Sequence, residues 1–450
     1  MNPTKNKILP TTRSRRHFIK TSGAAAGAVA ATIPSFSIGE NLKTKKLKVG
    51  QIGCGGRGNG AASQALKADE NVELWAVAEL YQEKIDTGLA VVSKGNKGKI
   101  NCPPKRQFVG LDAWEKVLNS GVDVVLLTTT PAFRPMMFEE AVKRGIHVFC
   151  EKPMGVDVPG VLRVAAAAKE AKQKGLSVMS GFCWRYNQAR REAFKKIQDG
   201  EIGDVRSVYA SYYTSPVKTI PEGKVKPEQM SDVEWQISNW HNFIWLSGDS
   251  IVEQAIHSVD KIAWAMGDVT PLTAVGMGGR EQPNPGGQIY DHFAVCYEFP
   301  NNIRCFMNSR QQRGTYNENA DYVTCTDGVL VIGRSSDPYI VNKEGRPIWR
   351  YRSKENSADT ANMYQQEHDE LFASIRNDSA HNDGEWMCNS TLIGIMGRNA
   401  AYTGQLIKWE DVLADETNLM PDSIKWDSYL DIGPTPVPGM DALAVPQIKA

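Results

Sequence analysis

A glycine-rich turn near the start of the chain constrains its fold more than any other feature. Gly53-Cys54-Gly55-Gly56-Arg57-Gly58 follows the apolar run Leu47–Ile52, which we predict to be a strand, and opens a helix predicted over Asn59–Lys67. This G-x-G-x-x-G spacing between a strand and a helix is typical of a dinucleotide-binding unit. The first glycine permits the tight turn, the second lets the backbone approach the pyrophosphate, and the third allows close helix–sheet packing.

An acidic residue stands where such a unit needs one. Glu79 directly follows a second predicted strand, Val72–Ala78, and lies 21 residues after Gly58. A carboxylate at this place accepts hydrogen bonds from the ribose hydroxyls. No Lys or Arg follows it before Lys84, so a 2′-phosphate would meet repulsion. The pattern therefore favours NAD over NADP, and the alternative is a purely structural glycine turn.

Strands and helices continue to alternate after Glu79. We predict strands over Val122–Thr128, Ile146–Phe149 and Leu176–Gly181, and a helix over Met136–Arg144. Alternation at this spacing indicates an α/β fold with a doubly wound parallel sheet. We assign residues 40–180 to this Rossmann domain.

The charge of the chain is divided unevenly. The first 39 residues hold six Lys or Arg and no acid, which leaves 46 basic and 51 acidic residues in the remainder. A mildly acidic body argues against a nucleic acid as the main partner. Hydrophobic residues make up 41% of the chain, which is typical of a globular protein.

The cysteine pattern indicates neither a zinc site nor a disulfide framework. No C-x-x-C pair is present, and no histidines complete a metal spacing, so we expect no metal. Several cysteines lie in apolar runs, where cysteine behaves as a small buried hydrophobe. We expect free thiols at Cys54, Cys102, Cys150, Cys183, Cys296, Cys305, Cys325 and Cys388.

The N-terminal segment, residues 1–39, is predicted to be an export signal. Ser14-Arg15-Arg16-His17-Phe18-Ile19-Lys20 precedes a short alanine-rich stretch, Thr21–Ile33. The paired arginines resemble the signature read by the twin-arginine translocase, which carries folded proteins. We therefore expect a periplasmic protein that binds its nucleotide before export. An ordinary basic N-terminus and an uncleaved anchor are the alternatives.

Glu151-Lys152-Pro153 follows the strand that ends near Cys150, so these side chains should face the ligand crevice. The chain from about residue 47 to 410 resembles the Gfo/Idh/MocA family. The resemblance rests on this E-K-P sequence, on the glycine turn, and on the strand ending at Thr128-Thr129-Thr130-Pro131. The resemblance implies that Thr128, Thr130, Pro131, Glu151 and Lys152 contribute to the cofactor site. It also implies a second, α+β domain built on a large, open, mostly antiparallel sheet.

The second half of the chain agrees with this expectation. We assign residues 181–416 to the second domain and 417–450 to a proline-rich extension, and expect the loop 215–231 to lie at the surface, where it could close over the site. The open sheet suggests a homo-oligomer, a dimer or tetramer, by fold-level analogy only. Strands are predicted over Asp204–Tyr213, Leu272–Met277, Phe293–Phe299, Ile303–Asn308 and Tyr322–Thr326, and helices over Tyr364–Ile375 and Asn389–Tyr402.

A second family-like sequence supplies candidate catalytic groups. Glu253 and His257 stand four residues apart, and we predict that they share one face of a helix. The resemblance implies that His257 is the acid–base residue and that Lys152 binds the reacting oxygen, with Glu253 orienting the substrate or tuning His257. The family's usual aspartate is glutamate here, and its glycine run is Ser247-Gly248-Asp249, which leaves the substrate class open.

Weaker candidates for substrate binding lie at strand ends, where a solvated loop or a core contact is an equally good interpretation. An aromatic cluster formed by Trp235, Trp240, His241 and Trp245 is best explained as core packing, although part of it could floor a sugar pocket. The substrate candidates are Trp184, Arg185, Tyr186, Asp260, Tyr290, Asp291 and Arg310.

These features lead to one main functional hypothesis and two alternatives. The first is an exported oxidoreductase that oxidises a sugar or glycoside hydroxyl with tightly held, recycled NAD. The second is an NAD-dependent glycoside hydrolase, in which a transient ketone labilises the glycosidic bond. The third is a sugar-binding protein without turnover, against which the combined presence of Gly53, Lys152 and His257 argues.

Overall fold

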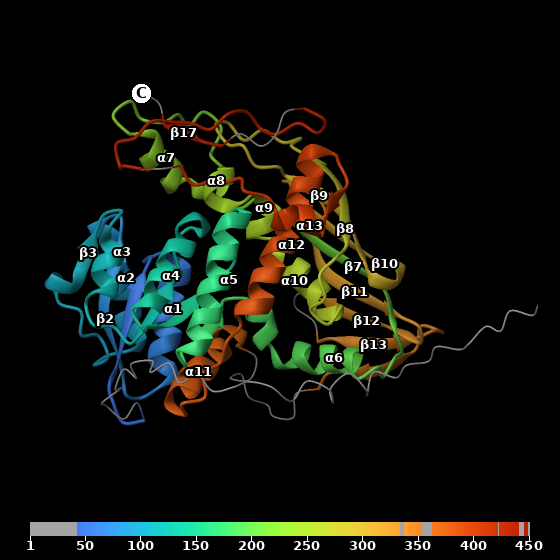
Figure 1. Cartoon of the computed structure of the whole chain (residues 1–450), viewed down its shortest axis with the longest axis horizontal. Coiled ribbons are helices and arrows are strands. Elements are labelled where there is room, and N and C mark those ends of the chain that lie inside the picture. Colours follow the sequence, from blue (N-terminus) through green and yellow to red (C-terminus); the bar gives the residue numbers. More distant parts are fainter. Residues whose placement is uncertain (1–42, 334–336, 353–361, 422, 441–444, 449–450) are drawn as a thin grey trace, which may run out of the picture. The chain divides into compact units, whose positions relative to one another are not determined.

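The computed structural model describes residues 43–333, 337–352, 362–421, 423–440 and 445–448. Its first part is a parallel sheet in the order β3-β2-β1-β4-β5-β6, which confirms the doubly wound fold (Figure 1). The strands are β1 (Leu47–Ile52), β2 (Val72–Glu79), β3 (Gln107–Val109), β4 (Val124–Leu127), β5 (His147–Cys150) and β6 (Val178–Ser180), and the helices are α1 (Gly56–Ala68), α2 (Gln82–Gly95), α3 (Ala113–Leu118), α4 (Arg134–Lys143) and α5 (Val158–Gln173).

Local sequence explains these elements. The strands β4 and β5 are buried at every position, as expected for a parallel sheet covered by helices on both faces. Helix α5 begins where the Asp157 side chain accepts a hydrogen bond from the amide of Gly160, with a proline in its first turn. Sequence order reverses between β1 and β4, so the crevice for a ligand opens at the carboxyl ends of these two strands.

The second part is a nine-stranded sheet in the order β14-β13-β12-β11-β7-β10-β9-β8-β15. All neighbours are antiparallel except β7 and β10, so the mostly antiparallel sheet is confirmed. Its strands are β7 (Val205–Thr214), β8 (Thr273–Gly279), β9 (His292–Phe299), β10 (Ile303–Gln311), β11 (Glu318–Cys325), β12 (Gly328–Gly333), β13 (Tyr339–Asn342), β14 (Pro347–Arg350) and β15 (Ile407–Lys408).

Helices of the second half cover one face of this sheet and also reach the Rossmann sheet. The long helix α12 packs on α5 and α10 and on the strands β8 and β9, and α11 packs on α1. The helices are α6 (Gln188–Gln198), α7 (Asp232–Ser238), α8 (Ile244–Ser247), α9 (Ser250–Glu253), α10 (Ile256–Ala265), α11 (Met363–Arg376), α12 (Gly384–Thr403) and α13 (Trp409–Leu413).

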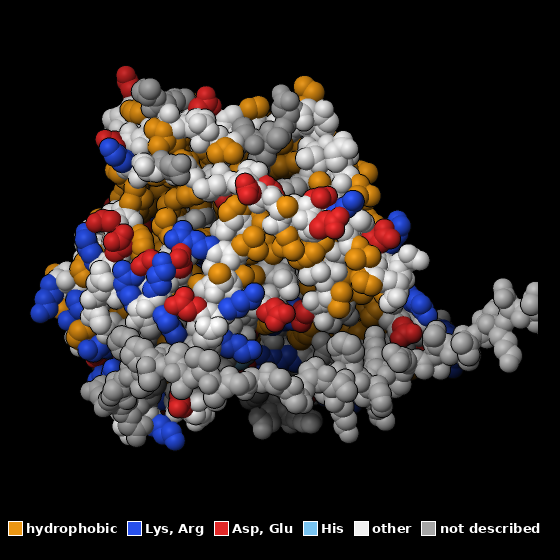
Figure 2. Space-filling model, in the orientation of Figure 1, with side chains coloured by type: hydrophobic (Ala, Val, Ile, Leu, Met, Phe, Trp, Pro, Cys, Tyr) orange, Lys and Arg blue, Asp and Glu red, His pale blue; other side chains and the backbone are white. Residues whose placement is uncertain are grey.

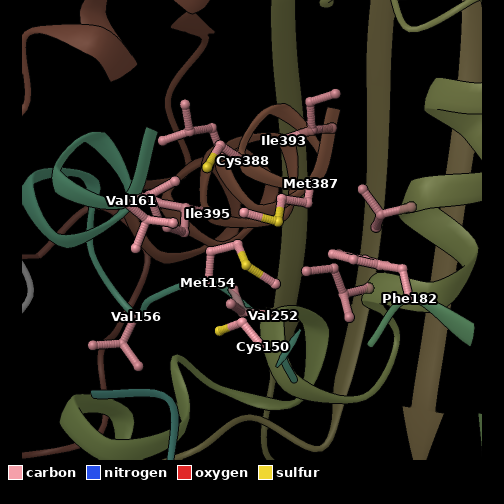
Figure 3. Close-up of a cluster of buried hydrophobic side chains, with 14 of the residues drawn as sticks. Cys150, Met154, Val156, Val161, Phe182, Val252, Met387, Cys388, Ile393 and Ile395 are labelled. Carbon is pink, nitrogen blue, oxygen red and sulfur yellow. The ribbon is translucent and has the colours of Figure 1, made fainter. Parts of the chain in front are cut away.

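One continuous hydrophobic core joins the two halves. Figure 3 shows Cys150 and Met154, at and beyond the end of β5, beside Val252 of α9 and Met387 of α12. All four side chains are fully buried or nearly so. Because the core includes both the end of β5 and the end of α9, it holds the residues that follow these two points close together.

The C-terminal extension crosses both halves, with two short strands, β16 (Leu430–Asp431) and β17 (Gln447–Ile448), as its regular structure. Figure 2 shows basic and acidic side chains interspersed over the Rossmann part of this face, and a hollow with hydrophobic side chains where the C-terminal segment passes. Within the described ranges, no helix has the length and apolar character needed to span a membrane. All eight cysteines are free thiols, as predicted, whereas the predicted export signal lies outside the described residues.

Candidate active site

The glycine turn is shaped for close approach by a ligand. A side chain at Gly58 would place its Cβ 2.0 Å from the carbonyl oxygen of Gly53, so only glycine fits there, whereas Gly55 and Gly56 face open space. Gly53 has a positive φ of 97°, which favours glycine. No side chain caps α1, so its first amides are available to a phosphate. These residues therefore fit a dinucleotide.

Two side chains from neighbouring strands hold this turn. Glu79 Oε2 accepts from the amide of Cys54 at 2.8 Å, and Thr128 Oγ1 donates to the carbonyl of Gly53 at 2.9 Å. The Glu79 carboxylate lines the cavity beside the turn, at the predicted ribose position. The thiol of Cys54 is buried in the domain core, so Cys54 contributes its backbone alone.

Two adjoining cavities follow the carboxyl edge of the Rossmann sheet. The first, of about 370 Å³, lies at Glu79 and the glycine turn and is also lined by Lys218, Lys224 and Trp240 of the second domain. The second, of about 440 Å³, contains Lys152. The two share lining residues from both domains: Gly55, Thr128, Thr129, Thr130, Lys218, Trp240 and His241.

The second cavity brings the three predicted catalytic residues together. Lys152, Glu253 and His257 all line it. Lys152 Nζ lies 3.0 Å from Glu253 Oε1 and also donates to the Glu253 backbone carbonyl. This pair links the end of β5 to the end of α9, directly beside the shared core described above.

The prediction that Glu253 and His257 share one helical face is wrong. Helix α9 ends at Glu253 and α10 begins at Ile256. In a continuous helix the Glu253 carbonyl would accept from the amide of His257, but it accepts from Lys152 Nζ. A tertiary contact thus replaces a helical hydrogen bond, and the Glu253 carboxylate points to Lys152 and to His241, whose Nδ1 lies 3.5 Å away.

Electrostatics set the charge of each group. Burial raises the pKa of Glu253, but Lys152 and His241 outweigh it and bring that pKa down to about 2. Burial lowers the pKa of His241 to about 4. Burial, together with the positive charges of Lys152 and Lys261, holds the pKa of His257 well below its ordinary value. At neutral pH the site therefore contains a carboxylate and two neutral imidazoles.

Most of the other predicted cofactor residues line these cavities. Arg57 and Glu151, whose side chains are 2.8 Å apart, lie on the wall of the second cavity. Pro131 is buried at the start of a short helical turn and lines neither cavity, which corrects its assignment as a cofactor residue. The predicted residues that do line them are Gly53, Gly55, Gly56, Arg57, Gly58, Glu79, Thr128, Thr130, Glu151 and Lys152.

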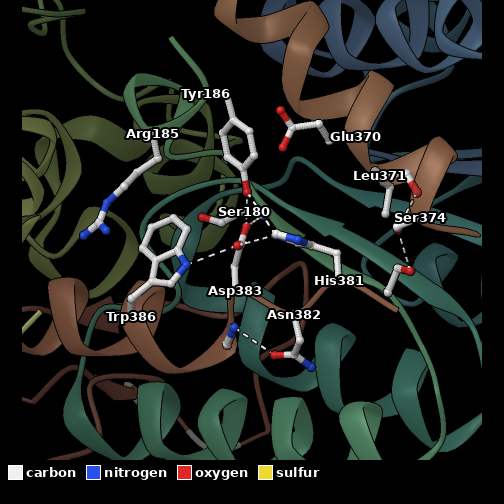
Figure 4. A network of polar contacts seen from close by, with 12 residues as sticks. Ser180, Arg185, Tyr186, Glu370, Leu371, Ser374, His381, Asn382, Asp383 and Trp386 are labelled. Carbon is white, nitrogen blue, oxygen red and sulfur yellow. Dashed lines mark hydrogen bonds and ion pairs between the residues drawn. The ribbon is translucent and has the colours of Figure 1, made fainter. Parts of the chain in front are cut away.

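Of the substrate candidates, Trp184 alone lines the second cavity. Arg185 is buried in an ion pair with Asp260 at 2.9 Å, between Trp264 and Trp386. The hydroxyl of Tyr186 donates to the buried carboxylate of Asp383 (Figure 4). The polar groups of Arg185, Tyr186 and Asp260 are thus paired inside the protein. These three residues therefore stabilise the packing and do not face the cavity.

The candidates on the large sheet lie elsewhere. Tyr290 and Asp291 line a separate hollow, where the Tyr290 hydroxyl donates to the carbonyl of Pro436. Arg310 stacks on Tyr213 and donates to the carbonyl of Tyr316. Their assignment to the substrate site is corrected, because these side chains lie in a separate hollow or on the open face of the sheet, although Arg310, His292 and Tyr213 are neighbours at one edge.

Several cavity residues were not predicted as site residues. Lys218 belongs to the predicted surface loop 215–231, and Trp240 and His241 belong to the predicted aromatic cluster. The sequence analysis therefore drew attention to these three residues without assigning them to the site. Tyr212, Asn319 and Tyr364 come from β7, β11 and α11, and no local pattern marks them. In the part of the chain that the structure describes, no group of three or more potential ligands could hold a metal.

Comparison with known proteins gives two family matches along the chain. Residues 47–180 match the oxidoreductase family with an NAD-binding Rossmann fold, and residues 191–331 match the GFO/IDH/MocA C-terminal domain. An inositol 2-dehydrogenase of Acidiphilium cryptum is 24% identical over 268 residues, 59% of this chain and 68% of that protein. A dTDP-3,4-didehydro-2,6-dideoxy-alpha-D-glucose 3-reductase of Actinomadura kijaniata is 26% identical over 180 residues, 40% of this chain and 48% of that protein.

The match thus spans about half the length of the reductase. Among solved structures, a levoglucosan dehydrogenase in complex with NADH and levoglucosan has the same fold, with a TM-score of 0.64 and 15% identity, over 80% of this chain and 99% of that one. The two family matches together cover more than half of this chain. The chain therefore belongs to the Gfo/Idh/MocA family of oxidoreductases, with an NAD-binding Rossmann domain followed by the family's C-terminal domain.

Proposed function

We propose that this protein is an NAD-dependent oxidoreductase that acts on a hydroxyl group of a sugar, polyol or glycoside. The observation that carries the proposal is the convergence of Lys152, Glu253 and His257 on a cavity that adjoins the glycine turn. Relatives and fold neighbours named as inositol, scyllo-inositol and levoglucosan dehydrogenases support this substrate class.

The chain's own residues can perform the proton chemistry. The Lys152 ammonium can donate a hydrogen bond to the reacting oxygen and stabilise negative charge there. A neutral histidine in the cavity can accept the hydroxyl proton, and the family resemblance points to His257 for this role. The indole of Trp184 offers a face on which a sugar ring can stack. NAD, when bound, supplies the acceptor for the hydride.

We propose further that the cofactor is held tightly and recycled. Lys218, Lys224 and Trp240 of the second domain line the same cavity as Glu79, so a dinucleotide there would be covered from both sides. Contacts between the domains support this arrangement. The Tyr81 hydroxyl of the Rossmann domain donates to Glu234 Oε1 at 2.9 Å, and the Tyr81 ring packs edge-on against Trp426 of the C-terminal extension.

Export in the folded state is a separate proposal. The paired arginines Arg15-Arg16 before an alanine-rich stretch support a twin-arginine route to the periplasm. Eight free cysteines suit folding in a reducing compartment before export. Fusion of residues 1–39 to a reporter that must fold before export would test this route, with Arg15→Lys/Arg16→Lys as the blocked control.

We also propose a homo-oligomer formed through the open face of the large sheet. Register places Val275, Cys296, Phe306 and Tyr209 in one row across β8, β9, β10 and β7. Val275, Phe306 and Tyr209 are 45%, 40% and 38% exposed, and a second copy would remove this apolar row from water. Light scattering should show a dimer or tetramer that dissociates in Phe306→Glu, whereas a monomeric wild type would refute the oligomer.

The decisive experiment for the activity uses the protein as purified, without added nucleotide. Acid release should yield NAD, and titration of the intact protein with myo-inositol, levoglucosan and simple glycosides should raise the absorbance of bound NADH with one class of compound. A released aglycone without net oxidation would identify the glycoside hydrolase alternative. Bound NAD that responds to none of these compounds would support a sugar-binding protein without turnover.

A further inference from the structure

The two cavities of the site adjoin at the glycine turn. The first contains Glu79, where the ribose of the adenosine half is expected, and the second contains Lys152 with the other proposed catalytic residues. A dinucleotide that spans both cavities would place its pyrophosphate, which joins its two halves, where the cavities adjoin. Gly55 of the glycine turn lines both, so this junction lies at the start of α1.

The Rossmann domain offers amides at this junction but little free positive charge. The uncapped N-terminus of α1 is equivalent to roughly +0.5 elementary charge. Arg57, in the first turn of α1, faces carboxylates instead: its Nε lies 2.8 Å from Glu151 Oε1, and its Nη2 lies 3.9 Å from Oε1 of the buried Glu367. Each phosphate of the pyrophosphate carries a negative charge, so the Rossmann side leaves part of that charge unbalanced.

Lys218 of the second domain lies at this junction. Of the described residues that line both cavities, it is the one charged at neutral pH, since the pKa of His241 is about 4. Its side chain is exposed and makes no ion pair with any residue that the structure describes. An ammonium group offers several N–H donors, so it can bind oxygens of both phosphates.

A buried asparagine holds the backbone at Lys218. Asn242 is fully buried, and its Nδ2 donates to the Lys218 carbonyl at 3.0 Å. Its Oδ1 accepts from Asn284 Nδ2 at 3.0 Å, and its carbonyl accepts from the amide of Gln288. Further along the loop, Ile220 is buried as well. These contacts fix the backbone of the loop beside the junction and leave the Lys218 side chain available to a ligand.

The other lysines of the first cavity are placed differently. Lys84 and Lys224 line the first cavity and not the second. Lys84 Nζ lies 5.3 Å from the centre of the Tyr81 ring, and Lys224 Nζ lies 5.4 Å from the centre of the Trp235 indole. Both lysines therefore adjoin the expected adenosine half of the dinucleotide and not the junction.

We infer that Lys218 binds the pyrophosphate of the dinucleotide from the side opposite α1, so that the second domain supplies positive charge that the Rossmann domain lacks. This inference rests on the proposed function and gives the proposed tight binding of NAD a chemical basis. Phosphate oxygens would be bound by the amides of α1 on one side and by an ammonium group on the other. Lys218 is thus a residue that retains the cofactor, and it takes no part in proton transfer.

The release of bound NAD tests this inference. The purified protein is mixed with a second dehydrogenase and its substrate, and the absorbance of NADH formed from released NAD is recorded. Lys218→Met should release NAD about tenfold faster, the effect expected for loss of one hydrogen bond to a charged group. Lys218→Arg keeps the charge and should stay close to the wild-type rate.

Two further lysine variants serve as comparisons for Lys218→Met. Lys224→Met, from the same loop, should have a smaller effect on release, and Lys343→Met, between β13 and β14 and outside both cavities, should have none. Equal acceleration in Lys218→Met and Lys224→Met would overturn the inference, because it would indicate a general effect of charge. Release from Lys218→Met at the wild-type rate would also overturn it.

Fragments of the cofactor localise the contact. ADP-ribose contains the pyrophosphate and adenosine does not, so Lys218→Met, freed of nucleotide with charcoal, should bind ADP-ribose about tenfold more weakly and adenosine as the wild type does. Calorimetry measures both affinities. Losses of equal size for the two fragments would refute the inference while the proposed function stands. A wild type that holds no nucleotide and binds none would refute the proposed function itself.

Discussion

Two buried ion pairs, each built from residues that the sequence placed in the site, have different surroundings. Lys152–Glu253 lines the cavity beside the glycine turn, and its side chains are 11% and 8% exposed. Arg185–Asp260 is as well buried, at 8% and 1%, but it lies between Trp264 and Trp386. The two ion pairs are similarly buried. They differ in that Lys152–Glu253 lines a cavity and Arg185–Asp260 is enclosed by other side chains.

The comparison also shows what each pair connects. Lys152–Glu253 joins the segment after β5 to the end of α9, and a third group, His241, approaches the same carboxylate. Asp260 instead receives a hydrogen bond from the hydroxyl of Ser390 on α12, and Arg185 makes a second ion pair with Asp268. The guanidinium of Arg185 and the carboxylate of Asp260 are thus bonded within the protein, whereas the first pair lines a cavity.

The largest expected effect comes from breaking the enclosed pair. Arg185→Leu leaves Asp260 buried without its main partner, and we expect the free energy of unfolding to fall by about 3–5 kcal/mol. Chemical denaturation measures this change. Because replacing both partners removes the uncompensated charge, Arg185→Leu/Asp260→Leu should recover part of the loss. A double variant less stable than the single one would contradict the packing role.

Breaking the cavity pair should affect catalysis more than stability. Lys152→Met removes the proposed donor to the reacting oxygen, and we expect NADH formation to slow by about 10²–10³-fold. Since Gln254 and His241 remain beside the Glu253 carboxylate, the loss in stability should be smaller than for Arg185→Leu. Equal losses of stability in Lys152→Met and Arg185→Leu would indicate that Lys152–Glu253 mainly stabilises the fold.

A weaker test concerns the cover over the first cavity. Trp426→Ala removes the edge-on contact with Tyr81, which is worth about 1 kcal/mol, so bound NAD should dissociate about fivefold faster. Dissociation can be followed by adding a second dehydrogenase with its substrate and recording the absorbance of the NADH that it forms from released NAD. Trp349→Ala, on β14, is the matched control and should leave the dissociation rate unchanged.

The smallest expected effect is a pH dependence of stability that comes from His381, near the buried residue Tyr186. A hydrogen bond with Asp383, Nε2 to Oδ1 at 2.6 Å, raises the pKa of His381 (Figure 4). Stability from this contact is therefore fully present below the unfolded pKa and is lost as pH rises through the folded value. Because the His381 side chain is 38% exposed, we expect less than about 1 kcal/mol between pH of about 6 and 8. His381→Gln should flatten the dependence; a wild type that gains stability over this interval would contradict it.

The Rossmann side of the site could be predicted from the sequence because its residues follow parallel strands. In such a sheet, the carboxyl ends of adjacent strands meet at one edge, so short local patterns at Gly53, Glu79, Thr128 and Lys152 report one location. The same rule failed for Arg310, which does lie at one edge with Tyr213 and His292 but shares the exposed face of Phe306. An edge position alone does not decide which face of a strand a side chain occupies.

Sequence by itself determined the glycine turn, the parallel strands on either side of it, and the place of Lys152 at a strand end, since each depends on local conformation. The family resemblance supplied Glu253 and His257. The tertiary structure alone decided the break between α9 and α10, the burial of Arg185 with Asp260, and the position of His241 at Glu253. Each of these depends on a partner far away in the chain. Spacing along the chain cannot reveal which distant group will satisfy a buried charge.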